Sequence, residues 1–212
     1  MIHCQCEGIE QLFSDTYARK ELKAYRKNGA SKSTLMLIAA IQAQKIESAK
    51  LLDIGGGVGA IQLALLKDSV ASSTVVDASG GYLAVAMEEA ERQALRERVS
   101  YHHGNFVDIA EKLSPADIVT LDKVICCYDD MPSLVSESVG LAKQYYGIVF
   151  PIENFLSQIQ DFFYNLWMGI TRNPYRSFLH PTLDIEAIIF EQGFKRVSYQ
   201  RQALWQIILY RK

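Results

Sequence analysis

The residues best placed to do chemistry lie in one glycine-rich stretch, residues 50–60, which reads KLLDIGGGVGA. An aspartate, Asp53, precedes four closely spaced glycines: Gly55, Gly56, Gly57 and Gly59. Glycine adopts positive φ easily and has no Cβ, so such a loop can turn sharply and let a ligand contact the backbone. Apolar residues before the loop predict a strand, and those after it predict a helix. This strand–loop–helix unit is typical of sites that bind nucleotide-like ligands beyond the ends of strands.

The glycine loop fits two cofactor templates. Gly55, Gly57 and Ala60 satisfy the G-x-G-x-x-A pattern, which would indicate NAD or FAD and hence an NAD-dependent oxidoreductase. Asp53 and the glycines at 55, 57 and 59 satisfy a different pattern, Asp-x-Gly-x-Gly-x-Gly. A dinucleotide places an anionic pyrophosphate at the helix N-terminus, and a carboxylate just ahead of the loop would repel it. Asp53 therefore favours a cofactor with a cationic group.

The second pattern resembles that of class I S-adenosylmethionine-dependent methyltransferases. The cofactor of that family carries an ammonium, a carboxylate and a sulfonium, and it has no phosphate. The resemblance implies a methyltransferase in which Asp53 and the glycine loop hold the methionine end of S-adenosylmethionine. It covers residues 48–150 well and the remainder in outline.

A second acid follows about one strand–helix–strand unit later. Residues 73–77 read as a short β-branched strand that ends in Asp77. An acid at this place can accept hydrogen bonds from both ribose hydroxyls, for NAD as well as for S-adenosylmethionine. We expect Asp77 and the adjacent Ala78 to belong to the cofactor site.

The third and fourth strands supply the remaining candidates of the cofactor site. The turn after residues 99–104 resembles the adenine site of the methyltransferase family, although Asn105 stands where the family usually has an acid. An amide oxygen can still accept a hydrogen bond from the adenine amino group, and Phe106 can pack on the adenine face. Asp122 ends the strand over 117–121, and the methyl acceptor usually approaches just beyond it in this family.

The alternation of apolar segments predicts the fold. From residue 50 onward strands and helices alternate, which is typical of a doubly wound α/β fold with helices on both faces of a mostly parallel sheet. Residues 194–201 and 203–210 predict a C-terminal hairpin that would add an antiparallel strand, as the methyltransferase family does. We expect a seven-stranded sheet in a single domain over 1–212.

Two further segments lie outside this alternation. Two helices, predicted over 8–28 and from a cap at Ser31 or Ser33 to about 46, form an N-terminal helical extension, residues 1–47, which would close over the cofactor. The insertion over 152–180 contains a predicted helix with a wide apolar face. That helix could pack on the sheet edge or on the N-terminal helices, form a lid over a hydrophobic or planar acceptor, or contact a membrane surface or a second copy in a homodimer.

The sequence leaves the catalytic residues open. Methyl transfer from a sulfonium requires a general base only if the acceptor is a poorly acidic group such as an alcohol or phenol. Tyr128 and His180 are the candidates we select, and Asp122 and Asp129 are alternatives. The tail from Phe178 onward resembles magnesium-protoporphyrin O-methyltransferases, whose carboxylate acceptor would need no base.

Composition limits the partners. The 212 residues include 49% hydrophobic and 22% charged residues with a formal net charge of −2, which predicts an ordinary folded domain and no attraction to nucleic acid. No apolar run reaches the length of a membrane span and the N-terminus has no signal-peptide pattern, so we expect a cytoplasmic protein without integral membrane association. The spacing of Cys4, Cys6, Cys126 and Cys127 predicts free thiols and no metal site. A non-catalytic methyltransferase-like binding protein remains a further alternative to an enzyme acting on a small-molecule methyl acceptor.

Overall fold

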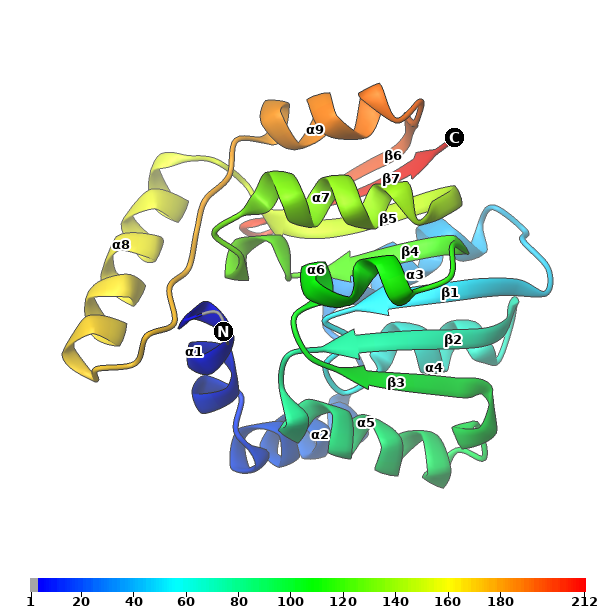
Figure 1. The fold of residues 1–212 in the computed structure, drawn as a ribbon, viewed down its shortest axis with the longest axis horizontal. Helices are drawn as coiled ribbons and strands as arrows, with labels where there is room; N and C mark the ends of the chain where they lie inside the picture. Colours follow the sequence, from blue (N-terminus) through cyan, green and yellow to red (C-terminus); the bar gives the residue numbers. More distant parts are fainter. Residues whose placement is uncertain (1–3) are drawn as a thin grey trace.

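The computed structural model describes residues 4–212, which form one central sheet covered by helices (Figure 1). The sheet has seven strands in the order β3-β2-β1-β4-β5-β7-β6. Strand β7 runs antiparallel to both β5 and β6, and the pairs among the first five strands are parallel. The predicted fold class is confirmed, including the antiparallel strand that the C-terminal hairpin inserts.

The elements follow one another along the chain with short connections. The strands are β1 (Ala49–Ile54), β2 (Val70–Asp77), β3 (Val99–His103), β4 (Ala116–Asp122), β5 (Ala142–Pro151), β6 (Lys195–Gln202) and β7 (Trp205–Arg211). The α-helices are α1 (Cys4–Leu12), α2 (Asp15–Asn28), α3 (Lys32–Gln42), α4 (Ala60–Leu66), α5 (Gly80–Arg92), α6 (Phe106–Ile109), α7 (Met131–Gly140), α8 (Phe155–Ile170) and α9 (Thr182–Glu191). Short 3₁₀ turns lie at Arg96–Arg98, Ala110–Lys112 and Ile125–Cys127.

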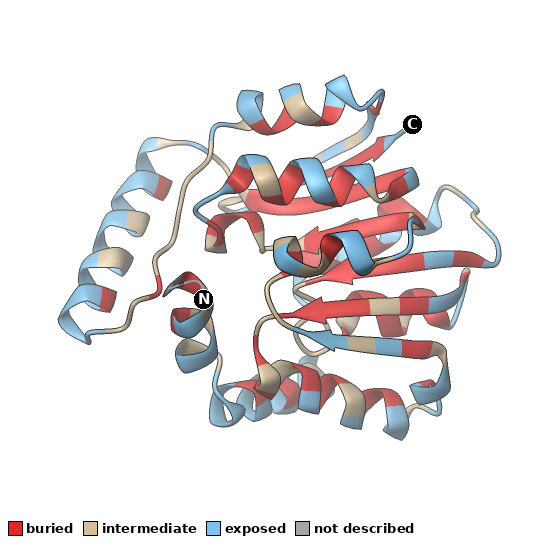
Figure 2. Cartoon of the chain, in the orientation of Figure 1, coloured by how far each residue is buried: buried red, intermediate tan, exposed pale blue. Residues whose placement is uncertain are grey.

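The sheet is buried on both faces, as parallel sheets require. One face packs against α7 and α9, through residues such as Leu134 and Ile189. The other face packs against α3, α4 and α5, through residues such as Leu37 and Leu63. The buried residues of the sheet form the central band in Figure 2.

The N-terminal extension differs from the prediction in one respect. The sequence predicted one helix over 8–28, whereas the chain breaks between α1 and α2 at Phe13 and Ser14. Ser79 Oγ donates a 2.7 Å hydrogen bond to the carbonyl of Phe13. A Cβ on Gly81 would approach the backbone of Ser14 and Asp15 within about 3.0 Å, so α5 begins against this turn. The turn is thus fixed by a tertiary contact that the helical periodicity does not contain.

Ion pairs connect helix α2 to helix α5. Arg26 Nε donates a 2.7 Å hydrogen bond to Glu89 Oε2, and Arg92 on α5 also binds this buried carboxylate. Hydrogen bonds from Arg92, the largest cause, and from Gln93 and Arg26 lower the pKa of Glu89 to about 2 against the effect of burial. These ion pairs hold α2 against α5.

Helix α8 stands apart from the sheet and exposes its apolar side chains to solvent (Figures 1 and 2). Among the large apolar residues of α8, Phe155, Leu156, Phe162, Phe163, Trp167 and Ile170 are each at least 60% exposed. The first alternative for this helix, packing of its apolar face on the sheet edge or the N-terminal helices, is therefore wrong. Within residues 4–212, no helix combines the length and apolar character needed to cross a bilayer.

Candidate active site

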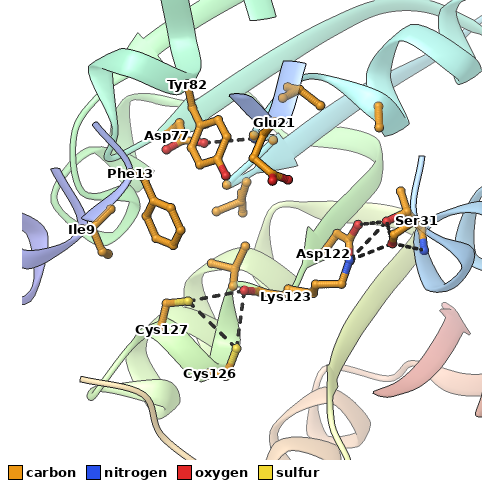
Figure 3. Close-up of a pocket in the computed structure, with 18 of the residues that line it drawn as sticks. Ile9, Phe13, Glu21, Ser31, Asp77, Tyr82, Asp122, Lys123, Cys126 and Cys127 are labelled. Atoms are coloured by element: carbon orange, nitrogen blue, oxygen red, sulfur yellow. Dashed lines mark hydrogen bonds and ion pairs between the residues drawn. The ribbon is translucent and has the colours of Figure 1, made fainter. Parts of the chain in front are cut away.

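The carboxyl ends of the parallel strands open into one cavity of about 820 Å³. Residues of α1, of α2 and of the segment after β4 line it, as Figure 3 shows, and the glycine loop and α8 also contribute to the lining. Most of the predicted site residues line this cavity: Asp53, Gly55, Gly56, Gly57, Asp77, Ala78, Asn105, Phe106, Asp122 and Tyr128. Gly59 and His180 lie outside the lining.

The glycine loop has the backbone conformation that its composition predicts. Gly55, Gly57 and Gly59 have φ values of 64°, 55° and 87°, in the left-handed region where side chains cause strain. A Cβ on Gly55 would also lie 2.4 Å from a Val124 methyl group. Gly59 is the residue before α4, so it shapes the loop without lining the cavity.

Asp53 is a buried carboxylate with one partner. Thr120, its register neighbour on β4, donates a 2.7 Å hydrogen bond from Oγ1 to Asp53 Oδ1. Asp53 Oδ2 is buried and has no hydrogen-bond partner among the described residues. The pKa of Asp53 is raised to about 7, mainly by burial and to a smaller extent by the nearby Asp122 and Asp77, while the Thr120 hydrogen bond opposes the shift. Sequence reasoning missed Thr120, although a polar residue within the apolar run of residues 117–122 was a usable signal.

Asp77 anchors the glycine loop to the end of β2. Its Oδ2 accepts a 3.1 Å hydrogen bond from the backbone N–H of Gly57, and its Oδ1 accepts a 2.8 Å bond from the N–H of Ser79. Burial raises the pKa of Asp77 to about 6, against the lowering effect of these two donors. Because each carboxylate oxygen has two lone pairs, Asp77 can still accept from a ligand hydroxyl.

Asn105 and Tyr128, predicted for separate roles, contact each other. The Tyr128 hydroxyl donates a 2.7 Å hydrogen bond to Asn105 Oδ1, which is the oxygen predicted to accept from adenine. Phe106 is buried and lines the cavity beside them.

Asp122 links the site to the start of α3. Thr34 Oγ1 donates a 2.5 Å hydrogen bond to Asp122 Oδ2, and Lys123 Nζ lies 3.5 Å from Asp122 Oδ1. Lys123 also donates to Ser31 Oγ at 2.9 Å, as Figure 3 shows. The sequence indicated Ser31 as a helix cap, but it gave no signal that Thr34 would reach the acid at the end of β4.

Aromatic residues form one wall of the cavity, which begins beside Asp77 with Tyr82 and Phe13 (Figure 3) and continues to Tyr175 and Tyr164. The ring of Phe13 lies 5.4 Å from that of Tyr82 and 6.1 Å from that of Tyr175. Tyr175 in turn packs edge-on against Tyr164 of α8 at 6.0 Å. This end of the cavity is therefore suited to a flat apolar group.

Hydrogen bonds link the segment between α8 and α9 to α1 and to the turn after β4. The buried Gln5 of α1 donates to the carbonyls of Cys127 and Arg176 and accepts from the Arg176 N–H. The Phe178 N–H donates a 2.8 Å hydrogen bond to the Cys126 carbonyl. His180 Nε2 donates to the Tyr128 carbonyl at 2.8 Å, so its ring is held by the backbone and not aimed into the cavity.

Cys126 and Cys127 line the cavity as free thiols, with their sulfur atoms 3.9 Å apart. Contact with Cys127, together with burial, raises the pKa of Cys126. Tyr175 donates a 3.1 Å hydrogen bond to Cys127 Sγ. The side chains of Cys4 and Cys6, for which the sequence predicted free thiols, lie outside the described residues.

Comparison with known proteins identifies the family. A family model described as an O-methyltransferase domain matches residues 2–159, about three quarters of the chain. The chain belongs to this family. It is accordingly an enzyme, an S-adenosylmethionine-dependent methyltransferase, and the predicted methyltransferase activity, cofactor and enzyme class are confirmed. The alternatives of an oxidoreductase and of a non-catalytic binding protein do not hold.

Curated and solved methyltransferases resemble the chain at different levels. A ubiquinone/menaquinone biosynthesis C-methyltransferase from Allorhizobium ampelinum is 26% identical over 186 residues, which cover 77% of this chain and 71% of the relative. The crystal structure of magnesium protoporphyrin IX methyltransferase from Synechocystis, solved with bound S-adenosylhomocysteine, has a TM-score of 0.75 at 16% identity. That match covers 96% of this chain and 98% of the other. An O-methyltransferase family protein from Burkholderia thailandensis has a TM-score of 0.72 at 17% identity, and covers 93% of this chain and 59% of its own.

The residues of this chain fit the cofactor of the family. The unpartnered oxygen of Asp53 lies where an ammonium group would satisfy it, beside glycines whose missing side chains leave the backbone open. A pyrophosphate would face three buried or half-buried acids here, Asp53, Asp77 and Asp122. The donor set thus agrees with an unphosphorylated, cationic cofactor.

Proposed function

We propose that this enzyme methylates a small hydrophobic or planar molecule in the cytoplasm, with S-adenosylmethionine bound by the residues predicted from the sequence. The main support for the proposal is that a single cavity contains both the acidic and the aromatic residues. One space joins Asp53 and Asp77 to the aromatic end of the cavity, which is formed by Tyr164 and Tyr175.

The acidic end supports the cofactor site. Asp53 would accept from the ammonium of the methionine end, and Asp77 from the ribose hydroxyls. Asn105 and Phe106 would contact the adenine, with Asn105 held in place by the Tyr128 hydroxyl. When bound there, the cofactor supplies an activated methyl group on a sulfonium.

The chain's contribution to catalysis is then to position the acceptor. The aromatic wall fixes the plane of the acceptor, and the segment held by Gln5 and His180 shields the cavity from water. Holding two reactants in line can supply most of the acceleration of a displacement reaction. Tyr128 lines the cavity and is the hydroxyl-bearing candidate for contact with the acceptor, whereas His180 supports the Tyr128 backbone.

Two measurements test this proposal. Isothermal titration with S-adenosylhomocysteine should give a one-to-one complex, and Asp53→Asn should weaken it. Transfer of a radiolabelled methyl group should then be screened over aromatic alcohols, acids and amines. Absence of S-adenosylhomocysteine binding at millimolar concentration would contradict the cofactor site, and methylation confined to nucleic acid or protein would contradict the acceptor class.

A homodimer is part of this proposal. The exposed apolar face of α8 supports it, because contiguous apolar surface of this kind usually marks an interaction site. Analytical ultracentrifugation of the protein and of a Phe162→Ser/Trp167→Ser variant tests it. A monomer at all concentrations of the unaltered protein would contradict the dimer.

A further inference from the structure

Helix α8 turns its polar side chains, and not its apolar ones, toward the cavity. Ser157, Gln160, Asp161 and Tyr164 line the cavity, and their spacing of three and four residues places them on one side of the helix. Met168 is buried, but the other large apolar residues of the same helix, such as Phe155, Phe162 and Trp167, are exposed. This arrangement is the reverse of an ordinary surface helix, in which the apolar stripe faces inward. The polar side of α8 therefore needs a partner inside the cavity.

Two polar atoms on this side are buried without a partner. Ser157 is 4% exposed, and its Oγ has no hydrogen-bond partner among the described residues. Asp161 Oδ2 accepts a 3.0 Å hydrogen bond from Asn165 Nδ2, whereas Asp161 Oδ1 is buried and has no such partner. A buried polar atom left unpaired costs free energy, and a carboxylate oxygen costs more than a neutral one. A ligand that donates a hydrogen bond here would remove that cost.

The groups around Asp161 indicate which kind of ligand could bind there. The described residues form no ion pair with Asp161, and the other groups near this end of the cavity are thiols and phenols, Cys126, Cys127, Tyr164 and Tyr175. The field of Asp161 reaches the thiols: the pKa of Cys126 is raised by Cys127, by burial and, as a smaller effect, by the Asp161 charge. A carboxylate placed here would meet a like charge, whereas a hydroxyl would meet an acceptor.

We infer that Asp161, together with Ser157, is a specificity-determining residue that accepts a hydrogen bond from a hydroxyl group of a planar aromatic acceptor. The aromatic body of that acceptor packs against Tyr164 and Tyr175, whose rings are 6.0 Å apart and nearly perpendicular. The same carboxylate disfavours acceptors that present a carboxylate at this place. The inference rests on the proposed function and names the substrate class for the aromatic end of its cavity.

Binding of three matched ligands tests the inference without knowledge of the natural acceptor. The ligands 2-naphthol, 2-methoxynaphthalene and 2-naphthoate share one flat ring system and differ in the hydrogen-bond donor and the charge. Their affinities are measured by fluorescence titration in the presence of saturating S-adenosylhomocysteine. We expect 2-naphthol to bind roughly tenfold or more tightly than either of the others, since a hydrogen bond to a buried carboxylate is among the stronger ones.

Asp161→Asn removes the charge, keeps the size of the side chain and still offers an amide oxygen to Asn165. We expect this variant to lose most of its discrimination against 2-naphthoate, while its affinity for S-adenosylhomocysteine stays unchanged. Ser157→Ala should weaken 2-naphthol binding by a smaller factor. Asp68→Asn is the matched control, because Asp68 is exposed and lies outside the cavity lining.

Several outcomes would overturn the inference. The first is equal or tighter binding of 2-naphthoate by the unaltered protein. The second is an unchanged preference in Asp161→Asn, and the third is failure of all three ligands to bind although S-adenosylhomocysteine binds. Loss of S-adenosylhomocysteine binding itself in the unaltered protein would instead overturn the proposed function, so the two failures are distinguishable.

Discussion

Thr120 Oγ1 donates a 2.7 Å hydrogen bond to Asp53 Oδ1 between neighbouring strands, and this bond leaves Asp53 Oδ2 buried without a donor. The threonine fixes the orientation of the carboxylate, whose second oxygen lies beneath Gly56 of the glycine loop. If Asp53 binds the cofactor as we propose, part of the binding free energy would come from satisfying this one oxygen atom.

Asp53→Asn should weaken S-adenosylhomocysteine binding by roughly ten- to a hundredfold, because a hydrogen bond between two charged groups is replaced by one to a neutral amide. Isothermal titration at pH 8 measures the change. Asp68→Asn, an exposed substitution of the same kind, should leave the affinity unaltered. Equal affinities for Asp53→Asn and the unaltered protein would remove Asp53 from the cofactor site.

The free energy of unfolding of the ligand-free protein should depend on pH because Asp53 titrates. The pKa of Asp53 is about 7 in the folded chain against an ordinary value of 3.8, so between these two values the folded state holds a proton that the unfolded state has lost. The contribution of Asp53 to the free energy of unfolding is thus fully present below about pH 4 and falls as pH rises through about 7. The Asp53→Asn variant lacks this pH-dependent contribution. Its free energy of unfolding, compared with that of the unaltered protein, should therefore increase as the pH rises from 5 to 8. Urea unfolding of both proteins at several pH values measures it, and a pH-independent difference would contradict the shift.

Binding should depend on pH in the opposite sense. Because the ammonium of the cofactor pairs with ionised Asp53, affinity for S-adenosylhomocysteine should rise as pH increases from 6 to 8. Thr120→Val removes the donor that opposes the upward pKa shift, so its affinity should rise over a higher pH range than in the unaltered protein. Coincident pH curves for the two proteins would show that Thr120 does not tune the acid.

Gly55→Ala should disrupt the loop. Alanine at φ 64° costs about 1–2 kcal/mol, and its Cβ would meet a Val124 methyl at 2.4 Å, so both stability and cofactor affinity should fall. Gly140→Ala is the matched control, since its Cβ would meet nothing within 4 Å at the end of α7, and it should raise stability by up to about 1 kcal/mol. Thermal unfolding with and without S-adenosylhomocysteine compares the two variants.

The role of His180 can be separated by two substitutions. A glutamine at this position can still donate to the Tyr128 carbonyl, whereas an alanine cannot. With an acceptor found in the screen, we expect His180→Gln to keep the pH profile of kcat, and His180→Ala to raise KM by about two- to tenfold. If His180 is instead the general base, both variants should lose about a hundredfold or more in kcat.

Local sequence pattern was enough to predict which residues gather at the carboxyl ends of the strands. Asp53, the glycine loop, Asp77 and Asp122 lie within or just after apolar strands, and the carboxyl ends of parallel strands meet at one edge of the sheet. Local pattern therefore sufficed to bring these residues together. The hairpin was predictable for the same reason, because strand alternation is a local signal.

The way in which α8 and the N-terminal helices enclose the cavity could not be predicted from local pattern. The apolar periodicity of residues 154–170 gave the helix, but an amphipathic pattern does not say which face a lone helix buries, and here the polar face turns inward. Gln5, Thr34 and Tyr175 meet the site from distant parts of the chain. Such contacts depend on how the N-terminal helices and α8 pack around the strand ends. The spacing of residues along the sequence does not show which of these distant segments come together.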